Sequence, residues 1–377
     1  MSTVDIFNLD ENINEFIQDD NKEDLLVIVG EFKQGHFLHV LSKIKAYQDK
    51  YEVNNGLARI FSLLKATCYS QTGEGKKASD IVSNMYENTN KAAIDDLILY
   101  GNLAYMCDYK LSRRIMSDVV SRLSDDKGID YNQSARAYLI LGQAEENLDK
   151  IRRAVKYYNR SLDYLQKEQP QDNELILFIN YKLGGLYSKI NEIDKAIQYL
   201  EQTIQLADES NQEVKINCFV SIGKLYGSSN HYEKANSYLK KAIPMLESSN
   251  LAGKFVHAEA YSELAYNNFD QKQYDEAIPL YEKAIGIYEK LPNNSKKTIG
   301  MMYMQYSYCM EHKKNPEKLL AATNYEKAIS FLEKSNDKEL IQSALGDVIS
   351  FFERTGNKKK KRQYENRFVQ LINERAN

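Results

Sequence analysis

Two stretches decide the fold: LGQAEENLDKIRRAVKYYNRSL at Leu141–Leu162 and LGGLYSKINEIDKAIQYLEQTI at Leu183–Ile204. The same pattern recurs at Ile222–Ile243 and at Leu264–Ile285. Small residues occupy matching places in the four copies: Gly142, Ala154 and Ser161; Gly184, Ala196 and Thr203; Gly223, Ala235 and Ala242; Ala265, Ala277 and Ala284. Small residues let two helices cross closely, and bulky residues fill the seam between neighbouring units. The pattern therefore predicts an array of helical hairpins.

This spacing resembles the signature of the tetratricopeptide-repeat (TPR) family, in which each unit pairs a helix A with a helix B. Weaker copies continue it upstream through Ala66 and Ala78, and downstream through Cys309 and Ala321. A copy around Ala104 has Met116 where the pattern requires a small residue. The resemblance implies an all-α chain, folded as a right-handed superhelix of about seven to eight TPR-like helical hairpins.

We expect three segments along the chain. Residues 1–50 should form an acidic N-terminal arm, disordered or partly helical, followed by a diverged helical hairpin with a glycine break. Residues 51–335 should form the TPR array. Residues 336–377 should form a degenerate C-terminal capping repeat, because terminal repeats need a polar outer face.

Charge and composition exclude several classes of function. The net charge is −3 with 27% charged residues, so there is no chain-wide basic surface, and we expect neither a nucleic-acid partner nor a DNA-binding domain. The four cysteines are isolated, which is typical of reduced thiols packed in helices. With no signal-peptide pattern and no long apolar window, we expect a soluble, cytoplasmic protein without a membrane partner. The oligomeric state stays open.

The TPR resemblance also implies where a ligand would bind. In that family, fixed positions of helix A line a concave groove. Carried onto this sequence, those positions are Arg136, Gln143, Tyr181, Asn217, Lys224, Glu259, Tyr266, Tyr303 and Tyr306. Amide side chains can bond a peptide backbone, and tyrosine supplies contact area at low entropic cost. The positions of the family's chaperone-tail clamp hold other residues, including Gln143 and Tyr181, so we do not expect chaperone-tail binding.

Other candidate sites are less specific. His36 and His39 lie three apart and could share a helix face as metal ligands do, but packing or solvation is the favoured interpretation, and we expect no metal and no cofactor. The basic run Lys358–Arg362 is best interpreted as a solvated face. Catalytic motifs are absent from the sequence, so we expect no catalytic residues.

Three functions stay open. The leading one is a TPR interaction module that binds a peptide or an extended protein segment in the groove, acting as a regulatory receptor. The second follows from a looser resemblance to the Rap-like peptide-pheromone receptors of Gram-positive bacteria, based on chain length and on repeats of about 40 residues. Some of these are response-regulator aspartate phosphatases that use a glutamine of the N-terminal bundle, for which Gln18 and Gln34 are available here. The third is a structural scaffold without a groove ligand.

Overall fold

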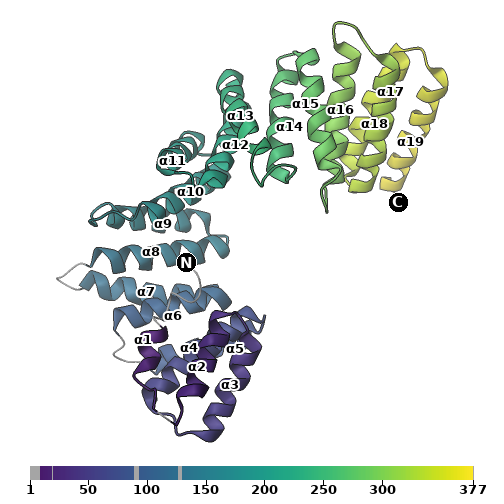
Figure 1. Cartoon of the computed structure of the whole chain (residues 1–377). Helices are drawn as coiled ribbons and strands as arrows, with labels where there is room; N and C mark the ends of the chain where they lie inside the picture. The colour runs from purple at the N-terminus through teal and green to yellow at the C-terminus, as the bar shows by residue number, and fades with distance from the viewer. Residues whose placement is uncertain (1–8, 19, 89–92, 126–129, 377) are drawn as a thin grey trace. The chain divides into compact units, whose positions relative to one another are not determined.

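The computed structural model describes residues 9–18, 20–88, 93–125 and 130–376, and every regular element in these ranges is a helix (Figure 1). The predicted all-α class is therefore confirmed. The chain divides into two compact units, residues 1–191 and 192–377. This division lies inside the predicted TPR array, whose boundaries at 51 and 335 remain predictions. No helix among the described residues combines the length and the apolar character needed to cross a bilayer.

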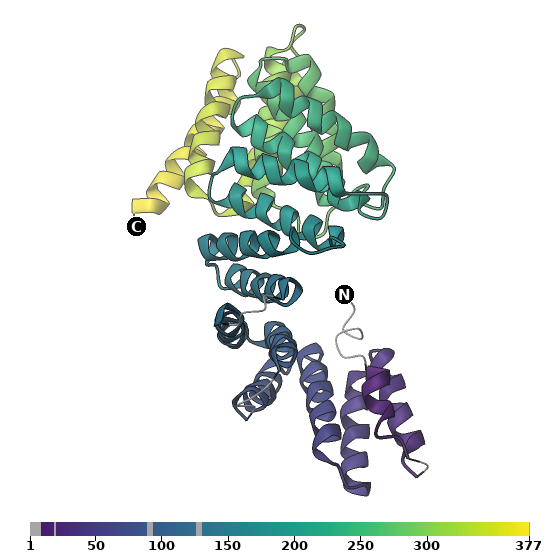
Figure 2. The same cartoon turned by 90° about the vertical axis from the view of Figure 1, so that its left-hand side faces the viewer.

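The first unit is a succession of antiparallel helices, drawn from purple to teal in Figures 1 and 2. Its helices are α1 (Leu9–Asn14), α2 (Lys22–Lys33), α3 (Phe37–Lys50), α4 (Asn55–Gln71), α5 (Gly75–Glu87), α6 (Ile94–Cys107), α7 (Tyr109–Asp125), α8 (Tyr131–Asn147), α9 (Ile151–Leu165) and α10 (Asn173–Lys189). Leu9 and Ile13 of α1 are buried, so this part of the predicted acidic arm is helical and belongs to the core.

The second unit continues the alternation of A and B helices, and Figure 1 shows α14 to α19 side by side. Its helices are α11 (Ile193–Leu206), α12 (Gln212–Ser228), α13 (Tyr232–Glu247), α14 (Phe255–Asp270), α15 (Tyr274–Tyr288), α16 (Lys296–His312), α17 (Lys318–Leu332), α18 (Lys338–Arg354) and α19 (Lys358–Ala376), with a 3-10 turn at Glu333–Ser335.

The small residues of the repeat lie where the helices of a hairpin cross. Ala154, Ala196, Ala235 and Ala277 are all completely buried. In the α12–α13 hairpin, a Cβ added to Gly223 would lie 2.6 Å from Leu239 Cγ, so only glycine fits against this leucine. In the α6–α7 hairpin the small residue at the crossing is Gly101 on α6, and it leaves the space that the bulky Met116 on α7 occupies. This is why the copy around Ala104 folds despite its departure from the pattern.

Several of the turns from helix A to helix B share one backbone conformation. Gly73, Asp149, Asn230, Lys272 and Gly356 each have a φ between +56° and +82°. Glycine, asparagine and aspartate adopt this left-handed conformation most readily, and it closes a helix by satisfying its last carbonyl groups. Five helices in the A position also begin at a side-chain cap, supplied by Asn54, Asp130, Asp172, Ser295 and Asp337. Local sequence signals therefore set many of the hairpin boundaries.

Candidate functional site

Polar side chains bridge successive A helices within each unit. In the first unit, Lys182 Nζ on α10 donates to Glu146 Oε1 on α8 at 3.1 Å. In the second, Lys297 on α16 pairs with Asp337 before α18 at 2.7 Å. A comparable bridge in the second unit joins α12 to α14, and around it lie several of the residues that the sequence placed in a groove.

Lys224 and two glutamates form the charged part of this face. Lys224 Nζ on α12 donates to Glu259 Oε1 on α14 at 2.5 Å. Burial opposes the lysine charge, but the hydrogen bond to Glu259 and the charges of Glu259 and Glu263 together outweigh burial and raise the pKa of Lys224. Burial raises the pKa of Glu263, one turn further along α14, while Lys224 lowers it and Glu259 raises it. One cation therefore faces two carboxyl groups in a partly dehydrated setting.

Aromatic rings continue the face from α14 to α16, and we call this set the aromatic ladder: Tyr266, Phe269, Tyr274, Tyr308 and His312. Tyr266 and Phe269 stack with centroids 6.3 Å apart, and Phe269 meets Tyr308 edge-on at 5.6 Å. Tyr308 in turn stacks on His312 at 3.9 Å. Tyr266 and Tyr308 stay 41% and 37% exposed, so the ladder offers aromatic surface to a ligand.

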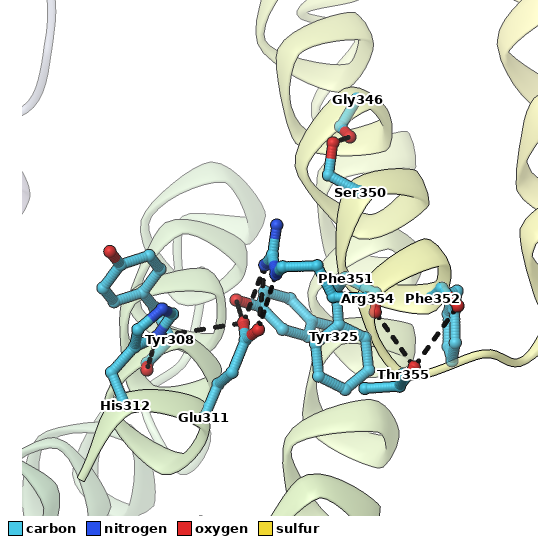
Figure 3. Close-up of polar contacts among 10 residues, drawn as sticks. All are labelled: Tyr308, Glu311, His312, Tyr325, Gly346, Ser350, Phe351, Phe352, Arg354 and Thr355. Atoms are coloured by element: carbon cyan, nitrogen blue, oxygen red, sulfur yellow. Dashed lines mark hydrogen bonds and ion pairs between the residues drawn. The ribbon is translucent and has the colours of Figure 1, made fainter.

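The far end of the ladder is held by an ion pair, shown in Figure 3. Arg354 of α18 donates to both carboxylate oxygens of Glu311, each at 3.0 Å, and so ties α18 to α16. His312 Nδ1 lies 2.9 Å from the carbonyl oxygen of Tyr308, which fixes the stacked ring pair. A two-pronged arginine–carboxylate contact has a defined geometry, so the ladder rests on an ordered support.

The nine predicted groove residues fall into three groups. Three lie in the first unit: Arg136 is exposed, and Gln143 and Tyr181 are half-buried. Four lie together on α12 and α14 of the second unit, namely Asn217, Lys224, Glu259 and Tyr266. We call these four, with Glu263 and the aromatic ladder, the α12–α14–α16 face.

Tyr303 and Tyr306 lie elsewhere on α16. Both are buried, with exposures of 7% and 6%. The hydroxyl of Tyr303 donates to Glu289 and its ring stacks on Phe331 of α17, while the hydroxyl of Tyr306 donates to Glu282 of α15. Their rings fill the seam between these helices and their hydroxyl groups are already bonded. On α16 the groove positions of the repeat thus correspond to buried tyrosines that pack against neighbouring helices, whereas Tyr308 has the exposed ring.

Three residues of this face were not predicted from the sequence: Glu263, Phe269 and Tyr308. Glu263 follows Glu259 by four residues and Phe269 follows Tyr266 by three, so helical spacing could have found both. Tyr308 had no such signal, because its exposure depends on how α16 packs.

The remaining candidates lie apart from this face. The thiols of Cys68, Cys218 and Cys309 are buried, and Cys107 is half-buried. In the basic run, Lys360 pairs with Glu326 and Lys361 with Glu353. A separate pocket of about 360 Å³ lies between α18 and α19, beside Ile341, Leu345 and Leu371. The α12–α14–α16 face is thus a partly exposed surface that carries both aromatic rings and charged groups.

Comparisons with known proteins agree with this architecture. Models described as "Tetratricopeptide repeat" match residues 135–164, 179–210, 216–243 and 257–291. These ranges correspond to the hairpins from α8–α9 to α14–α15. A search of curated protein sequences finds no match.

Solved structures with a similar fold cover nearly the whole chain. The apo form of RapI has a TM-score of 0.61 at 14% identity, covering 94% of this chain and 98% of RapI. The apo form of the quorum sensor NprR from B. thuringiensis has a TM-score of 0.53 at 13% identity, covering 94% of this chain and 99% of NprR. A signal-transduction ATPase with a tetratricopeptide repeat sensor, from Pyrococcus horikoshii, has a TM-score of 0.56 at 14% identity, covering 89% of this chain and 53% of that one. At such identities the likeness shows the fold alone, and the four matched ranges show that the chain contains tetratricopeptide repeats.

Proposed function

We propose that the α12–α14–α16 face binds a peptide or an extended protein segment that carries a basic group beside an apolar side chain. The observation that carries this proposal is the juxtaposition of exposed tyrosine rings with two carboxyl groups that share one lysine. Aromatic side chains supply rigid contact area and are enriched where proteins bind one another. The similarity in fold to the quorum sensor NprR is consistent with a role as a regulatory receptor.

Charge decides which peptide fits. Glu259 and Glu263 together exceed Lys224 by one negative charge when both are ionised. A lysine, an arginine or a free amino terminus would be attracted there, and the partial burial strengthens the attraction relative to open water. The aromatic ladder, one to two helical turns further on, would take an apolar side chain of the same ligand.

Peptide selection on the immobilised protein tests this proposal. We expect random-peptide phage display to enrich sequences that pair Lys or Arg with an aromatic or aliphatic residue. Tyr266→Ala should weaken binding of a selected peptide by about tenfold or more, as expected for a contact residue. Glu263→Gln should also weaken it, whereas Lys224→Ala should not, because it frees the carboxyl groups.

Leu319→Ala provides the matched control. Leu319 is 89% exposed on α17 of the same unit, outside the α12–α14–α16 face, so this variant should bind as the wild type does. If Tyr266→Ala and Glu263→Gln both retain full affinity, the face is not the binding site. If no peptide is enriched at all, the scaffold function takes the lead.

Response-regulator dephosphorylation is the second candidate, favoured by the fold match to RapI over 98% of its length. The two glutamines available for such chemistry are both exposed in the first unit: Gln18 lies in the loop between α1 and α2, and Gln34 follows the last residue of α2. A purified phosphorylated receiver domain should lose its phosphate faster with the wild type than with Gln18→Ala or Gln34→Ala. Equal rates for all three proteins would remove this candidate.

A further inference from the structure

Three side chains of metal-ligand type converge at the turn between α2 and α3. His36 Nδ1 lies 2.9 Å and His39 Nδ1 3.2 Å from the same carboxylate oxygen, Glu31 Oε2. One ligand atom from each residue lies within 4.8 Å of the other two. In the sequence the two histidines lie three apart and could share a helix face, with packing or solvation as the favoured interpretation; the structure adds the carboxylate.

The backbone of the turn holds these side chains together. Gly35 has a φ of +78°, its amide bonds the carbonyl of Phe32, and the amide of His36 bonds the carbonyl of Glu31 at 2.9 Å. This pair of bonds is the Schellman motif that ends a helix at a glycine. His36 directly precedes α3, and His39 lies in the first turn of that helix. The position of all three groups is therefore set by local hydrogen bonds.

We propose that Glu31, His36 and His39 form a binding site for a divalent transition-metal ion of the zinc class. Imidazole nitrogen and carboxylate oxygen are ligands that zinc takes in proteins, and three protein ligands leave a fourth position for water. Ligand atoms around a tetrahedral zinc ion lie about 3.3 Å apart, given zinc–ligand distances of about 2.0–2.1 Å. The two nitrogen–oxygen distances are already close to that value.

Metal binding would replace the two histidine–carboxylate hydrogen bonds. Each neutral imidazole would move its ring proton from Nδ1 to Nε2, freeing Nδ1 for the metal. Nε2 would then point to solvent, because the side chains of His36 and His39 are 51% and 74% exposed. The ion would link the end of α2 to the start of α3, so it would stabilise this hairpin of the first unit. Calcium and magnesium are not expected, since both prefer sites built of oxygen ligands.

Zinc titration of the full-length, tag-free protein against a chromophoric chelator tests the site. We expect one zinc ion to bind, and each of Glu31→Gln, His36→Gln and His39→Gln to weaken binding by at least about tenfold, the loss that even supporting residues of metal sites cause. Cobalt should give the visible absorption of a four-coordinate ion in the wild type and not in the variants. Helix content by circular dichroism should stay unchanged, because all three side chains reach solvent.

His231→Gln is the matched control, since His231 is another exposed histidine, in a turn of the second unit. It should bind zinc as the wild type does. Two outcomes would overturn the proposal: no zinc binding by the wild type at micromolar concentrations, or equal binding by the His36→Gln, His39→Gln double variant. The second outcome would assign the zinc to adventitious groups elsewhere, such as the half-buried Cys107.

Discussion

Replacing Gly223 with alanine adds one methyl group where α12 crosses α13. That methyl carbon would lie 2.6 Å from Cγ and 2.8 Å from Cδ2 of Leu239, and 3.3 Å from the carbonyl oxygen of Ala235. Leu239 is completely buried, so its side chain cannot turn aside into solvent. The helices must therefore move apart or the leucine must leave its preferred rotamer.

The free-energy change is the difference between two effects. Overpacking a filled core costs about 1–3 kcal/mol, and alanine gains about 1 kcal/mol over glycine inside a helix. For Gly223→Ala we expect a net destabilisation of up to about 2 kcal/mol, and of about 1 kcal/mol for a mid-range overpacking cost. Gly346→Ala is the matched control, because nothing lies within 4 Å of its added Cβ inside α18. That variant should be about 1 kcal/mol more stable than the wild type.

Hydrogen-exchange mass spectrometry can measure both changes where they occur. Protection should fall in peptides from residues 212–247 of Gly223→Ala and rise in peptides from residues 338–354 of Gly346→Ala. Adding Leu239→Ala should remove most of the extra cost of Gly223→Ala, since the two side chains would no longer compete for the same space. If Gly223→Ala gains as much stability as Gly346→Ala, the close helix crossing is not what requires glycine.

Three further predictions concern pH, thiol reactivity and backbone strain. Burial lowers the pKa of His257, a change that Glu247 opposes and Lys283 reinforces, and the amide of Gly253 donates to its Nδ1 at 3.0 Å. On acidification the unfolded chain therefore protonates this histidine at a higher pH than the folded protein does. The free energy of unfolding should fall as the pH drops below about 6.5, and in urea titrations it should depend less on pH for His257→Gln. Burial raises the pKa of Cys68, Cys218 and Cys309 to about 12 and that of Cys107 to about 11. A disulfide reagent should therefore modify Cys107 first and the other three thiols only on unfolding. Early reaction of all four thiols would contradict their burial. Lys272 has a φ of +61°, so Lys272→Gly should raise the free energy of unfolding in urea by about 1 kcal/mol. The gain should exceed that of Asn230→Gly at the equivalent turn, and an equal gain for both variants would count against backbone strain at the lysine.

The sequence alone determined the helical repeat, because the repeat depends on local spacing. Small residues such as Gly223 and Ala235 must recur wherever two helices cross, so their positions are visible in the sequence as a periodic pattern. The turn residues Asp149 and Asn230 are visible for the same reason, since the left-handed turn restricts which side chains it accepts. The sequence also placed Lys224, Glu259 and Tyr266 on helices in the A position.

Only the tertiary structure decided which of these side chains meet and which are buried. Tyr303 and Tyr306 are tyrosines like Tyr266, but the packing of α16 against α15 and α17 turns their rings into the core. Tyr308 reaches the aromatic ladder through contacts with a different hairpin, and Glu31 reaches both histidines through the turn at Gly35. Such contacts join residues on different helices, and their geometry depends on packing that the repeat spacing does not encode.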